Sequence, residues 1–341
     1  MKNLYFLKNK LQTTTFIILA MIPIFVDSYY VNNISFFMLW TFIALSLSLI
    51  WGKGGILSFG QAAFFGLAGY SFGIIGINFA DVFGVGVWSV ILALIITGIF
   101  GLIVGYFLFY GGIYDVFVGI VTLSITLVFE TFMSQTAGPE WTVGIARLNG
   151  FNGMQGMPSI GINLFGYKFL ALDNKGYYVI LILAILAIYL LDKLANSKFG
   201  LVLSASKEDR LRVQSLGYNV KKVHMLTFAI SSVLAGMSGI LYTNWGGFIT
   251  PESMGLVSAA LPVVYCAASG KNNFFAVFLG TILLVWISQE LAINGRQFAL
   301  IFMGLLLVIA TRYFPDGMFL FFINLLKKIT RKIIGKKIIG N

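Results

Sequence analysis

The 341-residue chain is 59% hydrophobic and only 10% charged, with a mean hydropathy of +0.92. A soluble domain carries about 25% charged residues, so composition excludes a soluble protein. The net charge of +11 could suit a nucleic-acid binder, but the basic residues gather at the ends of apolar runs, where they orient membrane proteins. The runs are long and uninterrupted rather than alternating, which excludes a β-barrel, and the first run carries no secretory cleavage pattern.

Apolar runs of about 20 residues, the length that spans a bilayer, predict an all-α, polytopic transmembrane helix bundle. We expect about ten spans, near residues 13–30, 33–51, 56–80, 85–109, 113–134, 176–192, 223–243, 253–270, 274–292 and 297–313. Glycines interrupt the third run from Gly52 onward, so a broken or half-inserted helix is possible near 52–66.

The loops between these runs differ in charge. In the ten-span scheme 19 of the 23 basic residues fall on one side, and Arg147, Lys168, Lys175 and Arg296 fall on the other. The positive-inside rule therefore predicts that both termini are cytoplasmic. We expect residues 1–341 to form a single transmembrane domain. Its parts would be an outside loop at 135–175, a cytoplasmic loop at 193–222 and a basic cytoplasmic tail at 316–341, which begins with a short helix at the inner membrane surface.

The chain shows no catalytic constellation and no Cys/His cluster for a metal. Its one histidine, His224, begins a span and is expected to sit at headgroup level, and its one cysteine, Cys266, lies in an apolar run. No GxxxxGK[ST] phosphate loop occurs, so the chain is not expected to bind ATP itself, to need a cofactor or to be an enzyme.

Polar residues inside spans are the candidates for a transport path. Asp115 and Glu130 fall within or at the ends of the 113–134 run, where carboxylates are costly; each could instead sit at an interface. Glycine breaks free backbone groups to face a cavity, and the break near residue 60 carries polar side chains. The candidate path residues are Ser58, Phe59, Gly60, Gln61 and Glu130.

The segment 205–219, read A-S-K-E-D-R-L-R-V-Q-S-L-G-Y-N, is too polar for a bilayer. It is charged and helix-prone, and it carries apolar Leu211, Val213 and Leu216 on its charged background. We interpret it as a cytoplasmic helix that docks on a partner protein. The Gly-, Asn- and Pro-rich loop at 135–175 indicates turns rather than a helix, and it either receives a soluble partner or is an inert connector.

Several motifs resemble one family. They are W-G at 51–52, G-G-I-L-S-F-G-Q-A-A-F-F at 54–65, I-V-T-L at 120–123, G-F-N-G-M-Q-G-M-P at 150–158, S-K-F-G at 197–200, K-E-D at 207–209, S-L-G-Y-N at 215–219 and F-I-T-P-E-S at 248–253. In this order and spacing they resemble the branched-chain amino-acid ABC-transporter permeases, and the LivM-type subunit in particular. Arg210 stands where an acidic residue is common in that family.

The resemblance implies a permease subunit of an ATP-driven importer in the bacterial inner membrane. Its partners would be a second homologous permease, two cytoplasmic ATPases and a periplasmic solute-binding protein. The resemblance gives an ATPase-coupling role to Lys207, Glu208, Asp209, Arg210, Arg212, Leu216 and Gly217. The docking candidates for the binding protein are Asn149, Gly150, Asn152 and Gly153.

Branched-chain or related amino acids are the expected substrates, with urea or short-chain amides as the alternative within the same family. A stand-alone ion-coupled transporter would predict charged residues at mid-membrane and no large basic inner loop, which is the opposite of what the sequence shows. An intramembrane enzyme would need a catalytic pair within the spans, and none is visible.

Overall fold

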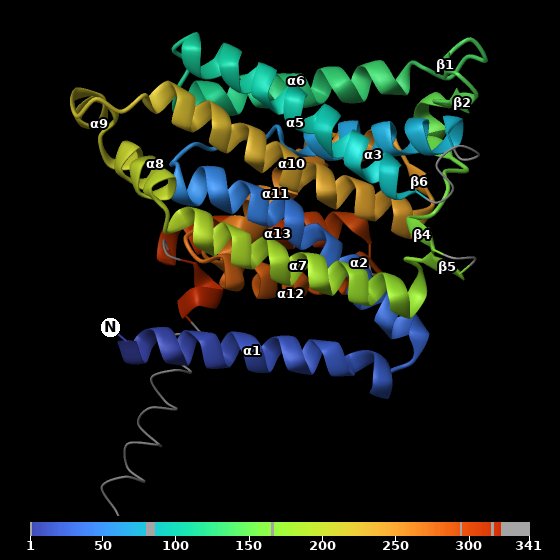
Figure 1. The fold of residues 1–341 in the computed structure, drawn as a ribbon, viewed down its shortest axis with the longest axis horizontal. Helices are drawn as coiled ribbons and strands as arrows, with labels where there is room; N and C mark the ends of the chain where they lie inside the picture. Colours follow the sequence, from blue (N-terminus) through green and yellow to red (C-terminus); the bar gives the residue numbers. More distant parts are fainter. Residues whose placement is uncertain (1, 80–85, 165–166, 294, 315–316, 322–341) are drawn as a thin grey trace, which may run out of the picture.

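The computed structural model describes residues 2–79, 86–164, 167–293, 295–314 and 317–321. Within this part of the chain, ten helices of 14 or more residues run between two ends of the molecule (Figure 1). One end carries the short helices α8 (Lys198–Glu208) and α9 (Arg210–Ser215) and is named the basic end. The opposite end carries short β-strands and is named the strand end.

The long helices alternate in direction between these two ends (Figure 1). They are α1 (Lys2–Phe25), α2 (Ser28–Leu47), α3 (Gln61–Asn78), α5 (Val87–Tyr110), α6 (Val116–Ser134), α7 (Asp173–Ala195), α10 (Val220–Gly246), α11 (Leu256–Ser269), α12 (Phe274–Ile293) and α13 (Arg296–Tyr313). A π-helical turn, η1 (Ser48–Lys53), extends α2 at the basic end. Accordingly α1 begins, and α13 ends, at the basic end.

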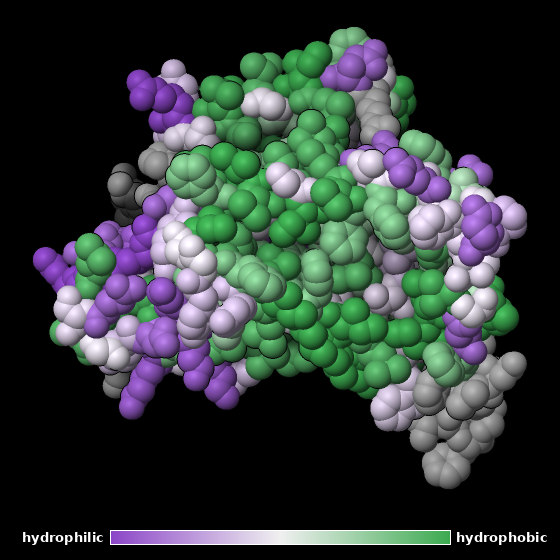
Figure 2. Space-filling model, turned by 90° about the horizontal axis from the view of Figure 1, so that it is seen from above, coloured by the Kyte–Doolittle hydropathy of each residue, from purple (hydrophilic) through white to green (hydrophobic). Residues whose placement is uncertain are grey.

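Among the residues that the structure describes, six helical stretches are both long and apolar enough to cross a membrane. They are Ser28–Lys53, Val87–Tyr110, Val116–Ser134, Asp173–Ala195, Val220–Gly246 and Phe274–Ile293, and shorter apolar helices cover Leu11–Phe25, Leu256–Ser269 and Gln297–Tyr313. Figure 2 shows a broad hydrophobic band over the middle of the bundle, flanked by hydrophilic ends. The chain is thus a multi-pass membrane helix bundle, while the number of about ten spans stays a prediction.

Helix α10 lies at the centre of the bundle, between α2, α3 and α5. Small residues let these helices approach closely. A Cβ at Gly239 would collide with the backbone of Phe65 on α3, and a Cβ at Gly101 on α5 would collide with Ser232 on α10. Gly239 and Gly101 therefore lie at helix crossings.

In the described part of the chain, the strand end contains three two-stranded antiparallel sheets. Strand β1 (Thr142–Val143) pairs with β2 (Ala146–Arg147), β3 (Met154–Gln155) with β6 (Phe248–Ile249), and β4 (Gly161–Leu164) with β5 (Tyr167–Leu170). Two 3-10 turns, η2 (Gly150–Asn152) and η3 (Pro251–Met254), complete this end. The described part of the 135–175 loop therefore forms hairpins, as well as the turns that its glycines predicted.

The basic residues divide between the two ends as the loop charges predicted. Positions 53, 271 and 312 lie at the basic end, whereas positions 147 and 175 lie at the strand end. Assigning the basic end to the cytoplasm stays a prediction. The expected tail at 316–341 falls almost wholly outside the described residues.

Candidate functional site

The helix break predicted near 52–66 is present between η1 and α3. The chain is not helical from residue 54 to residue 60, and α3 begins at Gln61. Gly55 adopts φ +73, a left-handed conformation that glycine reaches without strain. The predicted 56–80 run therefore does not form one helix. Its start belongs to a non-helical stretch, hereafter the 54–60 segment, and the rest forms a helix of 18 residues.

Hydroxyl groups on α6 bind the backbone of the 54–60 segment. The Phe59 N–H donates to Thr122 Oγ1 at 3.1 Å, and Thr126 Oγ1 donates to the Phe59 carbonyl oxygen at 3.1 Å. Backbone groups within a bilayer must find partners inside the protein. Two threonines one turn apart supply those partners, so the break is held against the middle of α6.

The predicted path residues at the break are mostly buried. Ser58 Oγ accepts a hydrogen bond from the Gly60 N–H at 3.1 Å. Gln61 Nε2 donates to Ser231 Oγ on α10 at 2.9 Å, and Ser231 donates to the Ser46 carbonyl on α2 at 2.8 Å. Gln61 Oε1 is buried and has no partner among the described residues. These polar groups thus tie α3 to α10 and α2 within the bundle.

Phe59 and Glu130 lie apart from this buried chain of hydrogen bonds. Phe59 lines a cavity of about 320 Å³ together with Asp115 and Gly119. Glu130 is one helical turn beyond Thr126, and its carboxylate lies against the backbone of Gly255, between η3 and α11. The structure therefore brings Ser58, Gly60 and Gln61 together but places Glu130 nearer the strand end.

The 205–219 segment forms two helices rather than one. Helix α8 ends at Glu208, and α9 begins at Arg210 after the N-cap Asp209, whose carboxylate accepts from the Arg212 N–H at 2.9 Å. Leu211 and Leu216 are 76% and 71% exposed. Val213 is buried instead, so the expected apolar face for a partner loses one of its three residues to the protein's own packing.

Helix α8 packs directly on the break. Lys207 Nζ donates to the Gly52 carbonyl oxygen at 3.1 Å, and the stem of Lys207 lies over Gly55. Leu203 lies against Gly54. A Cβ at Gly55 would collide with the stem of Lys207, and a Cβ at Gly54 would collide with the Ile50 carbonyl oxygen, so both glycines allow this close packing.

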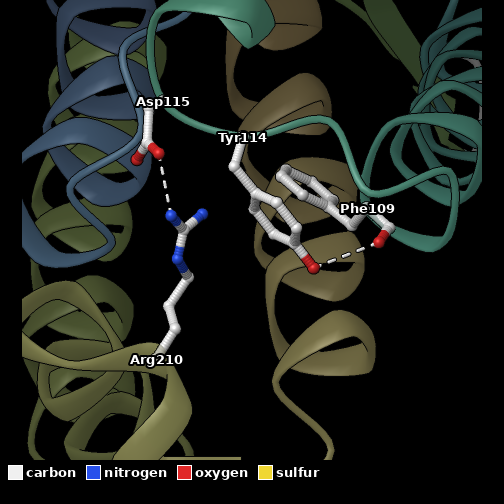
Figure 3. Close-up of polar contacts among 4 residues, drawn as sticks. All are labelled: Phe109, Tyr114, Asp115 and Arg210. Atoms are coloured by element: carbon white, nitrogen blue, oxygen red, sulfur yellow. Dashed lines mark hydrogen bonds and ion pairs between the residues drawn. The ribbon is translucent and has the colours of Figure 1, made fainter.

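Helix α9 is joined to the loop between α5 and α6. Arg210 Nη2 lies 2.8 Å from Asp115 Oδ2, and the Arg210 guanidinium lies 4.1 Å from the centroid of the Tyr114 ring (Figure 3). The Tyr114 hydroxyl donates to the Phe109 carbonyl at 3.2 Å (Figure 3). Burial raises the pKa of Tyr114 and the nearby Arg210 opposes that rise, so the phenol stays a neutral donor.

Two further contacts fix the basic end. Ser206 Oγ lies 2.9 Å from Nε2 of His224, which links α8 to α10. His224 is buried near the start of α10, and its position at headgroup level stays a prediction. On its other side, η1 contacts the α11–α12 turn, because Ser48 Oγ donates to the Lys271 carbonyl oxygen at 2.7 Å. The π-helical turn is therefore held between α8 and the α11–α12 turn.

The docking candidates at the strand end lie in and beside η2. Gly150 and Gly153 are buried and have positive φ angles, so both serve the turn itself. Asn152 is exposed, and Asn149 is half-buried in a left-handed conformation. Phe151 between them is 79% exposed. Of this cluster, Asn152 and Phe151 offer the most surface to another molecule.

Across the described residues, no group of three or more His, Cys, Asp or Glu side chains could hold a metal ion. What the structure shows at the basic end is a set of contacts between helices. Charged helices at the basic end contact a helix break, and the break is bound by α6, α10 and α2.

Comparison with known proteins decides the family. Residues 29–311 match the family model of the branched-chain amino acid transport system permease component. The chain belongs to this family. The match covers α2 through most of α13 and so includes the break, α8, α9 and the strand end.

Two LivM relatives each align with more than four-fifths of this permease. The high-affinity branched-chain amino acid transport system permease protein LivM of Escherichia coli is 26% identical over 326 residues, 91% of this chain and 75% of the relative. The probable LivM permease of Methanocaldococcus jannaschii is 25% identical, over 84% of this chain and 93% of the relative. The autoinducer 2 import system permease protein LsrC of Salmonella choleraesuis is 23% identical over 60% of this chain. No solved structure matches the chain.

Sequence reasoning missed several residues of this site. Thr122 and Thr126 are unremarkable hydroxyls within an apolar run, although their i, i+4 spacing puts both on one helix face. Asp115 was considered as a path residue or as a residue at the membrane interface; it lies just before the α6 helix and pairs with Arg210. No local signal marks that pair, because its partners are 95 residues apart.

Proposed function

We propose that the chain is a transmembrane permease subunit of an ATP-binding-cassette importer in the bacterial inner membrane. As one permease domain over residues 1–341, it moves branched-chain or related amino acids by alternating access. Its partners are a second homologous permease, two cytoplasmic ATPases that bind the ATP, and a periplasmic solute-binding protein. The chain itself needs no cofactor.

One observation carries the proposal. An exposed, charged pair of helices, α8 and α9, contacts both the helix break and the loop before α6. Lys207 reaches the Gly52 carbonyl, and Arg210 reaches Asp115. A partner that moves α8 and α9 therefore pulls on the 54–60 segment and on α6 together.

The exposed face of α9 fits a groove on an ATPase. Leu211 and Leu216 project from a background of charge that includes Glu208, Asp209 and Arg212. Exposed leucines flanked by charged residues are typical of a helix that packs into a partner's groove. With Lys207, Arg210 and Gly217, these residues form the proposed coupling surface.

The break supplies the moving part. Non-helical backbone at membrane depth persists where it is buried in protein or lines a cavity. The bonds of Phe59 with Thr122 and Thr126, and of Gln61 with Ser231, are few and exchangeable. Ser58, Phe59, Gly60 and Gln61 therefore rearrange when α8 moves, and Glu130 faces the solute nearer the strand end.

The strand end is the proposed docking surface for the solute-binding protein. Asn149, Gly150, Asn152 and Gly153 shape the turn that presents Phe151. Urea or short-chain amides are the alternative substrates. The likeness to an autoinducer 2 permease supports the view that this scaffold serves more than one class of small polar solute.

Affinity purification of the complex tests the coupling assignment. The double variant Glu208→Arg with Asp209→Arg should reduce recovery of the ATPase several-fold while the chain still inserts into the membrane. Arg147→Glu, a charge reversal at the strand end, should leave recovery unchanged. Full recovery with the double variant would count against the coupling role of α8 and α9.

A further inference from the structure

A second cavity lies between α2, α10, η3, α11, α12 and α13, toward the strand end. Its volume is about 470 Å³, which is within the range of about 300–1,000 Å³ for small-molecule sites. Four aromatic side chains form one wall: Phe36, Trp40, Tyr242 and Trp245. The residues of this cavity do not overlap with the helix break or with the coupling surface.

The aromatic wall is held by contacts outside the cavity. Trp40 stacks on Phe65 of α3, with ring centroids 5.4 Å apart and an interplanar angle of 11°. Trp245 lies 4.8 Å from Phe36, centroid to centroid, and its indole N–H donates to Asn32 Oδ1 at 2.7 Å. Because these rings are fixed, the wall presents a preformed apolar surface for an aliphatic group.

A tyrosine contributes to the lining of this cavity on the α11 side. Tyr265 on α11 is 3% exposed and lines the cavity, and its hydroxyl forms no hydrogen bond with the described residues. Tyr265 lies nine residues after the start of α11, about 14 Å along the helix. A ligand atom that accepts this O–H would form a hydrogen bond inside the cavity, which is stronger when the acceptor is charged.

The same face of α11 offers a hydrogen-bond acceptor about two turns nearer the N-terminus of the helix, where the mouth of the cavity lies. Ser258 lines the cavity seven residues before Tyr265, on the same helix face. Pro262 has no N–H, so the Ser258 carbonyl receives no hydrogen bond from that position. Tyrosine side chains on helices lean toward the helix N-terminus, which brings the Tyr265 hydroxyl toward Ser258. The Glu252 carboxylate adds negative charge at the mouth.

We propose that this cavity is a solute site of the permease and that it takes a free amino acid with an aliphatic side chain. The ammonium group binds the Ser258 carbonyl under the negative charge of Glu252. The carboxylate accepts the hydrogen bond of Tyr265, and the side chain packs on the aromatic wall. The choice of an amino acid rests on the function proposed above. A lipid chain fits this lining less well, because Glu252, Ser288 and Gln289 would then face hydrocarbon.

A labelling experiment on the purified complex in lipid nanodiscs tests this site without any transport step. In a Cys266→Ala background, Val257→Cys places a thiol on the cavity lining at the mouth. Saturating leucine should slow its reaction with a methanethiosulfonate reagent. Tyr265→Phe should raise the leucine concentration for half-protection about tenfold or more, as for a lost hydrogen bond to a charged group.

Tyr70→Phe is the matched control, because Tyr70 is also 3% exposed and its hydroxyl also lacks a partner, but it lies outside the cavity. It should leave half-protection unchanged. Absence of leucine protection, or equal shifts with Tyr265→Phe and Tyr70→Phe, would overturn the proposal. ATP-driven leucine uptake by the same complex reports on the proposed function separately: uptake without protection refutes the site alone, and uptake of urea instead of leucine refutes the substrate class.

Discussion

Arg210 of α9 and Asp115 of the α5–α6 loop form an ion pair, with 2.8 Å between Nη2 and Oδ2. The Arg210 side chain is 32% exposed and that of Asp115 is 73% exposed, so solvent screens the pair and its worth is about 1 kcal/mol or less. Its importance is positional, because it joins the coupling surface to the helix that binds the break.

Reversing the charge of Asp115 tests this connection. Asp115→Arg places two guanidinium groups together, and we expect ATP-driven uptake to fall about fivefold, which corresponds to about 1 kcal/mol. The double variant Asp115→Arg with Arg210→Asp restores opposite charges and should recover most of the uptake. Uptake in the double variant that is no better than in the single variant would contradict the role of the pair.

Gly52 is predicted to be intolerant of a methyl group. A Cβ there would collide with the backbone carbonyl of Lys271, and such overpacking costs about 1–3 kcal/mol. Gly52→Ala should therefore lower the thermal unfolding midpoint of the detergent-solubilised protein. Gly304→Ala on α13 meets nothing within 4 Å and should leave the midpoint unchanged or raise it. Equal midpoints for the two variants would show that η1 and the α11–α12 turn are not in close contact.

Variants of Thr122 and Thr126, the two threonines that bind the break, should impair transport without impairing assembly with the ATPases. Thr122→Val leaves the Phe59 N–H without its acceptor, and Thr126→Val removes the donor to the Phe59 carbonyl. A lost hydrogen bond of this kind costs about 1–3 kcal/mol, so uptake should fall about tenfold while ATPase recovery stays normal. Ser124→Ala on the same helix removes an exposed hydroxyl bonded only to Ile120 and should behave as the wild type. A Thr122→Val permease with wild-type uptake would argue against a moving break.

The Ser206–His224 contact is predicted to stabilise the packing of α8 on α10. Ser206→Ala leaves Nε2 of the buried His224 without its partner, at a cost of about 1–3 kcal/mol. Ser215→Ala removes an exposed hydroxyl bonded to the Leu211 carbonyl and should change stability by about 0.5 kcal/mol or less. Chemical denaturation monitored by tryptophan fluorescence distinguishes the two variants. Identical denaturation curves would show that the contact with His224 does not stabilise the basic end.

The apolar runs located most helices well, because bilayer thickness fixes their length. The run at 274–292 became Phe274–Ile293, and the run at 297–313 became Arg296–Tyr313. The glycines near residue 55 indicated the break, since φ +73 at Gly55 needs a residue without a Cβ. The first predicted span ran to residue 30, but α1 ends at Phe25 and α2 begins at Ser28, because aromatic residues near 30 continue the apolar signal across a turn.

Contacts between distant segments were beyond sequence reasoning. A hydropathy run gives the length of a helix but not its neighbours, so nothing indicated that Thr122 and Thr126 face Phe59. The pairing of β3 with β6 joins strands of two residues each, which are too short for any alternation to register. Val213 matches Leu211 in polarity and yet is buried, because which face of a short helix packs inward is decided by tertiary contacts.

Omission tests on the reconstituted system measure the central claim most directly. The permease is placed in proteoliposomes with its homologous permease, the two ATPases and the solute-binding protein, and uptake of labelled leucine is followed. We expect uptake that requires ATP and that stops when either the ATPases or this chain is left out. Leucine uptake that persists unchanged without ATP or without the ATPases would contradict the proposed function.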